Sequence, residues 1–256
     1  MIDIHNHIIP GVDDGPVDEK SMIDLIKQAA EQNITGIIAT PHHLHYRYNN
    51  EFEEVANKVA KINENEKVKE LGVTVYPGQE IRITDQLLVD LDNGKIKGLN
   101  NSKYLLLELP SNQVPSYCQN LIYEIQIRGY VPIIVHPERN KVIAQDINIL
   151  FGLVNIGALS QITASSLTGE LGRKTQKNSM LMIENNLTHF IASDAHNIEN
   201  RPFGFDKVFS KGKHAYLKDK IESLISNNEM LLNDKKIKIS RPIEYKKSKF
   251  LSMFSK

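Results

Sequence analysis

The chain has 256 residues, 41% of them hydrophobic, and its equal numbers of basic and acidic residues give a formal net charge of zero. This size and composition suffice for one sizeable core, and α/β barrels of this length are usually single domains. No apolar run is long enough to span a bilayer and no secretion signal opens the chain, so we expect a cytoplasmic protein without a membrane span. A single cysteine, Cys118, excludes an intrachain disulfide.

The charge is unevenly distributed along the chain. Residues 235–256 hold eight Lys or Arg and one acidic residue, which leaves residues 1–234 with a net charge of −7. We therefore expect a domain over residues 1–234 and a basic C-terminal tail over residues 235–256. Such a tail is typical of a solvated terminus, and the alternative is docking on an acidic partner or on anionic lipid. The acidic bulk of the chain offers no broad basic surface, so we expect no nucleic acid partner.

The chain opens with the β-prone run MIDIHNH, in which His5 and His7 stand two residues apart. Because side chains alternate between the faces of a strand, both imidazoles point to the same side, where one cation could bind both. Two aspartates follow at positions 13 and 14, and either could be a ligand because a loop breaks the periodicity. The spacing of Met22, Leu25, Ile26 and Ala29 then predicts a helix over residues 21–33.

Six further apolar runs have the length of strands, and five of them lead to a candidate metal ligand. They are TGIIAT before His42, VTVYPGQE with Glu80, YLLLEL with Glu108, VPIIVH with His136, ALSQIT over residues 158–163, and THFIASDAH with Asp194 and His196. Helical spacing predicts helices over residues 51–71, 119–128, 143–154, 175–185 and 217–225. Alternating strands and helices predict an α/β fold with seven parallel strands that close, or nearly close, into a barrel.

The C-terminal ends of the strands in such a barrel share one face, and active sites lie there. Nine candidate ligands fall at these ends: His5, His7, Asp14, His42, Glu80, Glu108, His136, Asp194 and His196. Imidazoles and carboxylates without a thiolate favour manganese, iron or zinc in a catalytic site, and nine ligands are enough for two or three ions. Paired metals recur in the hydrolysis of phosphate esters, so we expect a phosphoesterase.

Two arginines lie close to these ligands in the sequence. Arg139 follows His136 in HPERN, and Arg201 follows His196 by five residues. A guanidinium matches a phosphate with two parallel hydrogen bonds, so both are candidates for binding the phosphoryl group. The alternative is a local ion pair with Glu138 or Glu199.

Other histidines and aromatic residues do not fit the ligand pattern. Strand alternation predicts that His43 points away from the site, and we leave His45 out of the ligand set as well. His189 opens a strand at the end opposite to the site and His214 lies in a late helical region, so both are expected to be structural. Residues 46–48, Tyr-Arg-Tyr, form a loop in which an aromatic ring could stack on a substrate ring, unless the loop is simply packed or exposed.

Seven motifs in order resemble one known superfamily. They are HNH at 5–7, the aspartate pair at 13–14, ATPHH at 39–43, GQE at 78–80, LLLEL at 105–109, HPERN at 136–140 and SDAH at 193–196. From Met1 to about Asp206 the chain resembles the polymerase and histidinol phosphatase (PHP) superfamily. Within it, the chain is most similar to the manganese-dependent tyrosine-protein phosphatases of Gram-positive capsule and exopolysaccharide loci. Carboxylates at Asp14 and Glu108, where much of the superfamily has histidine, favour this branch.

The resemblance implies a distorted, TIM-like (β/α)7 barrel that holds three manganese ions. It implies that His5, His7 and Asp194 hold one metal, that Glu80 bridges it to a second held by Glu108 and His136, and that Asp14, His42 and His196 hold the third. It also implies a substrate, phosphotyrosine on the C-terminal tail of a partner bacterial tyrosine kinase. We expect a metal-bridging hydroxide to attack the phosphorus, with Arg139 stabilising the phosphoryl charge and His42 as a candidate acid for the leaving tyrosine.

The residues that follow Cys118 do not match the motif of a cysteine-dependent phosphatase. Cysteine-dependent tyrosine phosphatases need an arginine six residues after the cysteine, but Glu124 stands six residues after Cys118. Alternatives that remain open are a small-molecule phosphatase of the histidinol phosphate type, a nuclease of the PHP kind, and a non-catalytic metal-bound scaffold for the kinase tail. Assembly into a homo-oligomer is also open.

Overall fold

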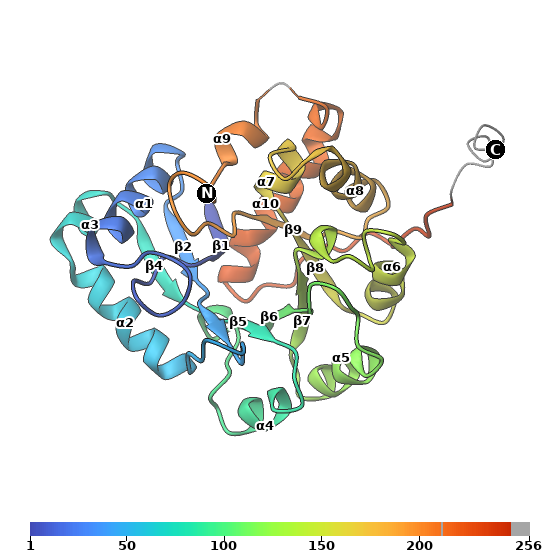
Figure 1. Cartoon of the computed structure of the whole chain (residues 1–256), viewed down its shortest axis with the longest axis horizontal. Helices are drawn as coiled ribbons and strands as arrows, with labels where there is room; N and C mark the ends of the chain where they lie inside the picture. The colour runs from blue at the N-terminus through green and yellow to red at the C-terminus, as the bar shows by residue number, and fades with distance from the viewer. Residues whose placement is uncertain (211, 247–256) are drawn as a thin grey trace.

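The computed structural model describes residues 1–210 and 212–246 and contains two parallel sheets (Figure 1). Strands β1 (Ile2–Asn6), β2 (Gly36–Ala39) and β4 (Thr74–Pro77) form a three-stranded sheet in the order β1-β2-β4. Strands β3 (His42–His43), β5 (Glu80–Arg82), β6 (Tyr104–Glu108), β7 (Val131–Val135), β8 (Leu159–Thr163) and β9 (Phe190–Ala192) form a six-stranded sheet in that order. Every pairing is parallel, which confirms the predicted α/β class.

The predicted run VTVYPGQE is divided between the two sheets, and the predicted run TGIIAT is followed by a short further strand in the other sheet. β2 leads into β3 past Pro41, which has no amide hydrogen to donate to a ladder, and β4 leads into β5 past Gly78. A Cβ atom at Gly78 would lie 2.7 Å from Cδ2 of Leu99 and 2.8 Å from Cγ2 of Ile38, so glycine allows these side chains to pack closely on the backbone there. These two bends turn the strands from one sheet into the next.

The outer strands β1 and β9 meet along a short seam. The His7 amide donates to the Ala195 carbonyl at 2.8 Å, the Asp194 amide donates to the His5 carbonyl at 2.7 Å, and Asn6 forms an isolated parallel bridge with Ala195. In the described part of the chain no regular ladder joins β1 to β9 themselves. Complete closure of the barrel therefore stays a prediction.

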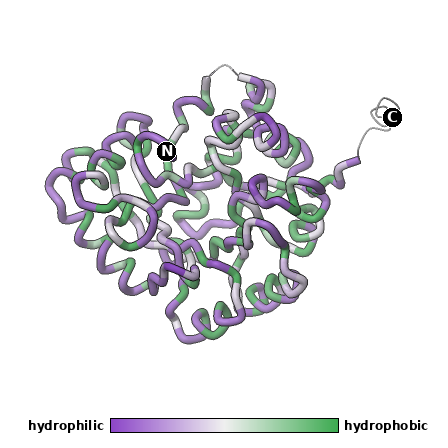
Figure 2. Tube along the Cα trace, in the orientation of Figure 1, coloured by the Kyte–Doolittle hydropathy of each residue, from purple (hydrophilic) through white to green (hydrophobic). Residues whose placement is uncertain are grey.

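The helices lie outside the strands (Figure 1). They are α1 (Glu19–Glu31), α2 (Phe52–Glu64), α3 (Glu66–Glu70), α4 (Leu87–Asp92), α5 (Cys118–Ile127), α6 (Asn148–Asn155), α7 (Ala164–Thr168), α8 (Arg173–Glu184), α9 (Phe205–Val208) and α10 (Lys218–Leu232), with 3-10 turns η1 (Leu99–Asn101), η2 (Pro137–Arg139) and η3 (Ala215–Leu217). Hydrophobic and hydrophilic residues alternate along the outer helices, as Figure 2 shows. The Met22, Leu25, Ile26 and Ala29 stripe of α1 is buried as its spacing predicts, after a capping box formed by Asp18 and Ser21.

Three helix predictions were wrong in extent, and one of them, over residues 217–225, falls seven residues short of the end of α10 at Leu232. The predicted helix over residues 51–71 is broken at Asn65, whose extended backbone (ψ 122°) ends α2 and whose side chain accepts a hydrogen bond from the Lys67 amide to begin α3. The predicted helix over residues 143–154 begins only at Asn148, because the Asp146 carboxylate accepts from the Asn148 amide at 3.0 Å and holds a turn there. Asparagine and aspartate compete with helix in this way through their own side chains.

Apolar side chains pack on both faces of the strands. One set packs the outer faces of the strands against the helices, and the other fills the interior with Ile4, Ile38, Leu106, Ile133, Leu159, Phe190, Leu231 and Ile237. Helix α10 closes this interior from below, where the buried Asn228 side chain donates to the carbonyls of Ile2 and Ile191, both at 2.9 Å. Leu106 and Glu108 lie on the same interior face of β6, because side chains alternate along a strand. The apolar interior therefore ends in polar groups at the C-terminal ends of the strands.

The described part of the basic tail runs along the surface of the domain. The Tyr245 amide donates to Oδ1 of Asn148 at 2.8 Å, the Ile243 amide donates to the Asn185 carbonyl at 2.9 Å, and Ile237 is buried. The apolar residues Phe250, Leu251, Met253 and Phe254 lie outside the described residues. The division into residues 1–234 and 235–256 stays a prediction. No described helix has both the length and the apolar character needed to cross a membrane.

Replacing Asn228 with Ala is expected to lower the free energy of unfolding by about 1–3 kcal/mol, because two buried carbonyls lose their donor. Urea unfolding followed by circular dichroism measures the change. Ser226→Ala, an exposed position in the same helix, is the matched control and should change stability by less than about 0.5 kcal/mol. Equal stability of the two variants would contradict the role of α10 as the closure of the barrel.

Candidate metal centre

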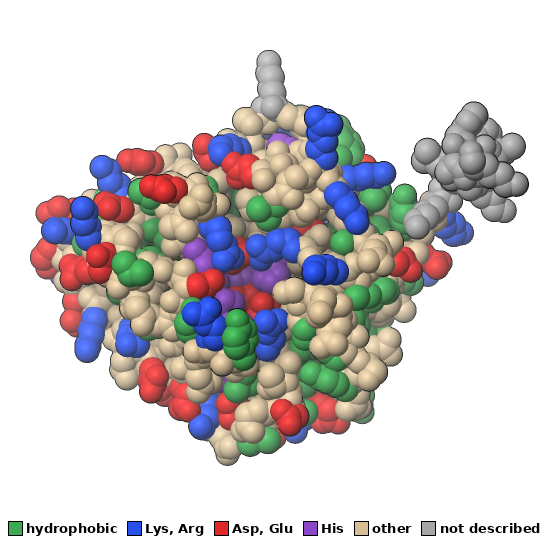
Figure 3. Space-filling view, in the orientation of Figure 1, with side chains coloured by type: hydrophobic (Ala, Val, Ile, Leu, Met, Phe, Trp, Pro, Cys, Tyr) green, Lys and Arg blue, Asp and Glu red, His purple; other side chains and the backbone are tan. Residues whose placement is uncertain are grey.

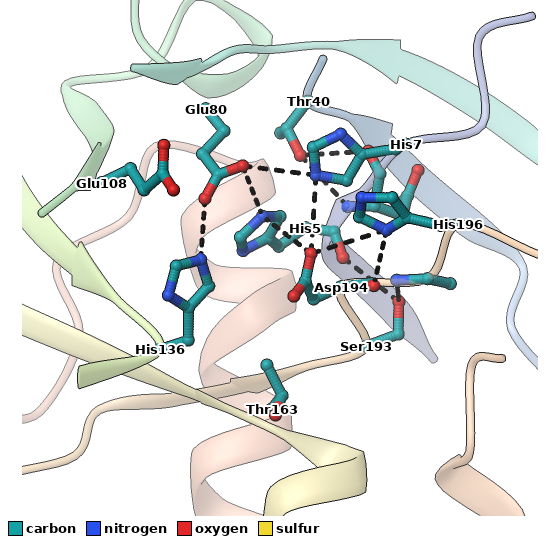
Figure 4. A network of polar contacts seen from close by, with 12 residues as sticks. His5, His7, Thr40, Glu80, Glu108, His136, Thr163, Ser193, Asp194 and His196 are labelled. Carbon is teal, nitrogen blue, oxygen red and sulfur yellow. Dashed lines mark hydrogen bonds and ion pairs between the residues drawn. The ribbon is translucent and has the colours of Figure 1, made fainter. Parts of the chain in front are cut away.

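The nine candidate ligands come together at one end of the strands, although they span residues 5 to 196. Figure 4 shows His5, His7, Glu80, Glu108, His136, Asp194 and His196. β1 supplies His5 and, one residue past its end, His7, and β5 and β6 supply Glu80 and Glu108. His136, Asp194 and His196 follow β7 and β9, and Asp14 lies in the loop between β1 and α1. Glu80 and His42 begin β5 and β3, and they also follow the ends of β4 and β2. The convergence arises because all strands are parallel, so their C-terminal ends lie at one face.

Four of these groups face a common point. Nε2 of His5 lies 3.5 Å from both Oε2 of Glu80 and Oδ1 of Asp194, and Nε2 of His7 lies 3.3 Å and 3.5 Å from the same two oxygens. These separations are long for hydrogen bonds. Two ligand atoms about 2.1 Å from one tetrahedral cation are roughly 3.4 Å apart, so the four atoms fit the first predicted metal.

A second group forms around the other side of Glu80. His42, Glu80 and Glu108 each offer a ligand atom within 4.8 Å of the others, and Nδ1 of His42 lies 2.9 Å from Oε2 of Glu80. His136 was expected here with Glu108. Nε2 of His136 lies 2.8 Å from Oε1 of Glu80, the predicted bridging ligand, and His42 groups with the two glutamates.

The third group contains the three residues expected there, together with His7. Oδ1 of Asp14 lies 3.2 Å from Nε2 of His196 and 3.5 Å from Nε2 of His42. Asp14 is half exposed, whereas its neighbour Asp13 turns inward to Nδ1 of His7 at 2.7 Å. The geometry therefore separates the two aspartates that the sequence could not separate by spacing.

Many polar atoms in these groups are buried without a partner. Among the described residues, the side-chain atoms without a well-aligned hydrogen bond include Nε2 of His5, His7 and His196, Nδ1 of His42, Oε2 of Glu80 and Glu108, and Oδ1 of Asp194. Nδ1 of His42 and Oε2 of Glu80 are close, but their geometry is not that of a hydrogen bond. A buried polar atom without a partner is costly, and such atoms seldom gather by chance. Both nitrogen and carboxylate donors point inward, which fits divalent cations.

The pKa values of the cluster show the same imbalance of charge. Burial would raise the pKa of Glu80, but the imidazoles of His5, His42 and His136 hold it well below its usual range. Burial and the charge of Glu80 raise the pKa of Glu108 to about 7. Burial and the nearby Arg139 lower the pKa of His136 to about 4. Cations in the cluster would let both glutamates ionise and all imidazoles stay neutral.

Local backbone geometry directs the ligands. β1 shifts register by one residue between Asp3 and Asn6, a bulge that changes the direction of its side chains next to His5. His136 and Asp194, the first and second residues past their strands, have left-handed backbone with φ of 35° and 58°. Few residues other than glycine adopt this conformation, and where they do it often serves a functional site.

Three residues support the ligands: Gln161 and Arg82 were missed from the sequence, and Asp13 was considered there only as a possible ligand. Nδ1 of His5 contacts Oε1 of Gln161 at 2.8 Å, and Asp13 contacts Nδ1 of His7, so each ring keeps its Nε2 turned inward. Nε of Arg82 lies 3.3 Å from Oε2 of Glu108. Arg82 stands two residues after Glu80 in β5, so the alternation rule applied to His5 and His7 would have found it.

The two predicted arginines meet at one carboxylate. Nη2 of Arg139 and Nη2 of Arg201 both donate to Oδ2 of Asp194, the latter at 2.9 Å, and Nη1 of Arg201 lies 3.5 Å from Oδ2 of Asp14. Among the described residues neither arginine forms an ion pair within 4.0 Å with Glu138 or Glu199, the local alternatives. Both line the cavity of about 510 Å³ that opens onto the cluster.

The remaining histidines lie outside the cluster. His43 points away to Asp90 of α4, with Nε2 3.4 Å from Oδ2, as alternation predicts. His189 accepts from the Ser160 amide at the opposite strand end, and His214 contacts the Val208 carbonyl, so both are structural as expected. His45 stacks on the His42 ring at 4.8 Å without entering the ligand groups.

Comparison with known proteins agrees with this geometry. Residues 1–233 match the family described as capsular polysaccharide synthesis, CpsB/CapC. The chain belongs to the CpsB/CapC family. This confirms the resemblance to the capsule-locus branch that the seven motifs indicated.

Relatives in the CpsB/CapC family match the whole chain. The chain is 49% identical to CapC of Staphylococcus aureus over 99% of this chain and 100% of the relative. It is 39% identical to the tyrosine-protein phosphatase YwqE of Bacillus subtilis, again over 99% and 100%. A crystal structure from a study of YwqE and of CpsB from Streptococcus pneumoniae, described as unique metal-dependent tyrosine phosphatases, superposes with a TM-score of 0.91 and 39% identity. It covers 96% of this chain and 100% of that one.

Replacing Asp13 with Ala is expected to weaken metal binding about 10- to 100-fold, because the His7 ring loses the carboxylate that orients it. Titration of metal-stripped protein with Mn²⁺, followed by calorimetry, measures the change. Asp24→Ala, an exposed aspartate of α1, is the control and should bind as the unmodified protein does. Unchanged affinity in the Asp13 variant would show that this contact does not support a metal site.

Proposed function

We propose that this protein is a metal-dependent protein-tyrosine phosphatase that acts in capsular polysaccharide synthesis. The observation that carries the proposal is the buried cluster of imidazoles and carboxylates, with its inward-facing atoms left without partners. Family membership supports it, since YwqE is named a tyrosine-protein phosphatase. The same cluster favours hydrolysis over a scaffold role, because a scaffold would not need so many buried imidazoles and carboxylates without hydrogen-bond partners.

Manganese is the metal we propose, with iron or zinc as alternatives. The donors are five imidazoles and four carboxylates, and no cysteine joins them, which suits such metals. His5, His7, Glu80 and Asp194 would hold one ion, and the groups around Glu108 and Asp14 would hold the others. Bound cations supply an activated water and neutralise charge on the phosphoryl group.

Arg139 and Arg201 would bind the phosphoryl oxygens of the substrate. Each uses Nη2 on Asp194, and Arg139 has no other hydrogen-bond partner among the described side chains, so its remaining N–H groups are free for a ligand. Because Asp194 holds both guanidiniums beside the cluster, they are oriented before substrate binds. His42, the candidate acid for the leaving tyrosine, lines the same cavity, but its Nδ1 faces Glu80 and its Nε2 faces Asp14. It can protonate the tyrosine only if it does not itself hold a metal.

The mouth of the cavity suits an aryl group. His45, Tyr46 and Tyr48 line it together with Arg47, and the Tyr48 ring lies parallel to His42 at 6.0 Å with an interplanar angle of 5°. Tyr46 is 84% exposed, so its ring remains available for stacking. A phosphotyrosine ring would enter between these aromatic faces while its phosphoryl group reaches the cluster.

The partner we propose is the phosphotyrosine tail of a bacterial tyrosine kinase that controls capsular polysaccharide synthesis. The family description places the chain in that process, and a tail segment is flexible enough to reach a recessed site. Such a tail would be met in the cytoplasm. The cytoplasmic location and assembly into a homo-oligomer stay predictions.

Metal-stripped protein resupplied with Mn²⁺ is expected to release phosphate from phosphotyrosine peptide, and at least tenfold more slowly from phosphoserine peptide. Rates on histidinol phosphate and on single-stranded DNA, measured in the same assay, distinguish the other PHP activities. A preference for either of those substrates would keep the metal centre and overturn the tyrosine phosphatase proposal. No turnover on any substrate would favour the scaffold.

Cys118→Ser is expected to leave kcat/KM unchanged, whereas His136→Ala should reduce it by at least 100-fold. Cys118 is buried at the start of α5, where burial raises the pKa of its thiol to about 11, so little thiolate forms at neutral pH. His136 contacts Glu80 in the centre of the cluster. Steady-state kinetics on phosphotyrosine peptide, with circular dichroism to check folding, makes the comparison. The reverse order of effects would restore a thiol mechanism.

A further inference from the structure

A second cavity lies beside the one that opens onto the cluster. Its volume is about 600 Å³, and it is bounded by η2 and the segment after it, the first turns of α8, and the loop after β9. The two cavities share three lining residues, Arg139, Asp194 and Arg201. Because both guanidiniums bind the same carboxylate, this triad forms the wall between the cavities.

The second cavity is rich in cations. Lys141 and Lys174 line it in addition to the two arginines, and its acidic residues are Asp194, already bound by both guanidiniums, and the buried Glu138. Both lysines are exposed, and neither forms an ion pair with a described residue. Figure 3 shows Lys and Arg side chains around the central hollow that holds histidines and acidic groups. The cavity therefore carries unneutralised positive charge.

The start of α8 adds to this positive potential. The helix runs from Arg173 to Glu184, its N-cap is Gly172, and no side chain caps its first amides. Lys174 and Thr175 of this first turn line the cavity. Free amides at a helix N-terminus favour an anion, as the lysines do. The volume of about 600 Å³ and the position next to the catalytic cavity suit a side chain of a bound peptide.

We propose that this second cavity binds an anionic side chain of the substrate that lies close in sequence to the phosphotyrosine. Lys141 and Lys174 recognise the anion, and the Arg139–Asp194–Arg201 wall sets its distance from the phosphoryl group. A carboxylate and a second phosphorylated residue share the chemistry required. The inference rests on the proposed function, because it deepens the substrate preference of that site.

The test compares kcat and KM on three substrates: a phosphotyrosine peptide with neighbouring Glu residues, the same peptide with Gln in their place, and para-nitrophenyl phosphate. The metal-loaded protein is expected to show a lower KM for the acidic peptide, and 0.5 M NaCl should remove the difference. The double variant Lys141→Gln, Lys174→Gln should raise KM for the acidic peptide roughly three- to tenfold, as expected for two partly solvated ion pairs. Its kcat, and both constants for the other two substrates, should not change.

Lys177→Gln is the matched control, since Lys177 is an exposed lysine of the same helix that does not line the cavity. It should leave all constants unchanged. A peptide with a second phosphotyrosine in place of the Glu residues separates the two sources of charge: a stronger preference for it identifies the phosphorylated residue, and an equal or weaker one identifies the carboxylate.

Two results would overturn the inference. One is equal KM for the acidic and neutral peptides in the unmodified protein. The other is a decrease in kcat/KM of the double variant that is equally large on all three substrates. Turnover of phosphotyrosine without a charge preference would leave the proposed function intact. No turnover of any phosphotyrosine substrate would remove both.

Discussion

Four carboxylates and five imidazoles share one small, largely buried volume, and the rest of the structure is organised around that constraint. Ionised carboxylates lose much of their hydration when buried, and imidazoles can offset this only where a nitrogen carries a proton. In this cluster the unpartnered atoms face one another rather than forming complete pairs. Divalent cations neutralise the charge of the buried carboxylates more fully than protons on the imidazoles can. The donor set therefore indicates a metal centre rather than a salt-bridge network.

The two sheets separate this polar volume from the apolar packing that stabilises the fold. Below the cluster the interior is apolar and is closed by α10, so the strands are fixed by packing that involves no ligand. Above it the side chains are fixed by partners one layer farther out, such as Gln161 and Asp13. A ligand can therefore be replaced without unfolding the chain, and an outer partner can be replaced without removing a ligand. This is the arrangement that rigid positioning of a reactive group requires.

Much of this was predictable from sequence because the strands are short, apolar and parallel. A run such as YLLLEL shows both its burial and its end, so Glu108 could be placed at a strand end without coordinates. Residues that act through a partner were not predictable in this way. Gln161 sits in a run that carries no candidate ligand, and Asp13 became distinct from Asp14 only when the loop was folded. The break at Asn65 was missed because a side-chain hydrogen bond overrides a continuous apolar stripe.

The seam between β1 and β9 joins metal ligands that are synthesised at very different times. His5 and His7 lie on one side of this seam and Asp194 and His196 on the other, and few backbone hydrogen bonds cross it. Any ion held by both sides fastens the first strand of the chain to the last. A nascent chain on the ribosome carries its first histidines for nearly 190 residues before their counterparts emerge. An ion held by ligands from both sides can thus be captured only after Asp194 and His196 have been made, so its capture follows the synthesis of both outer strands.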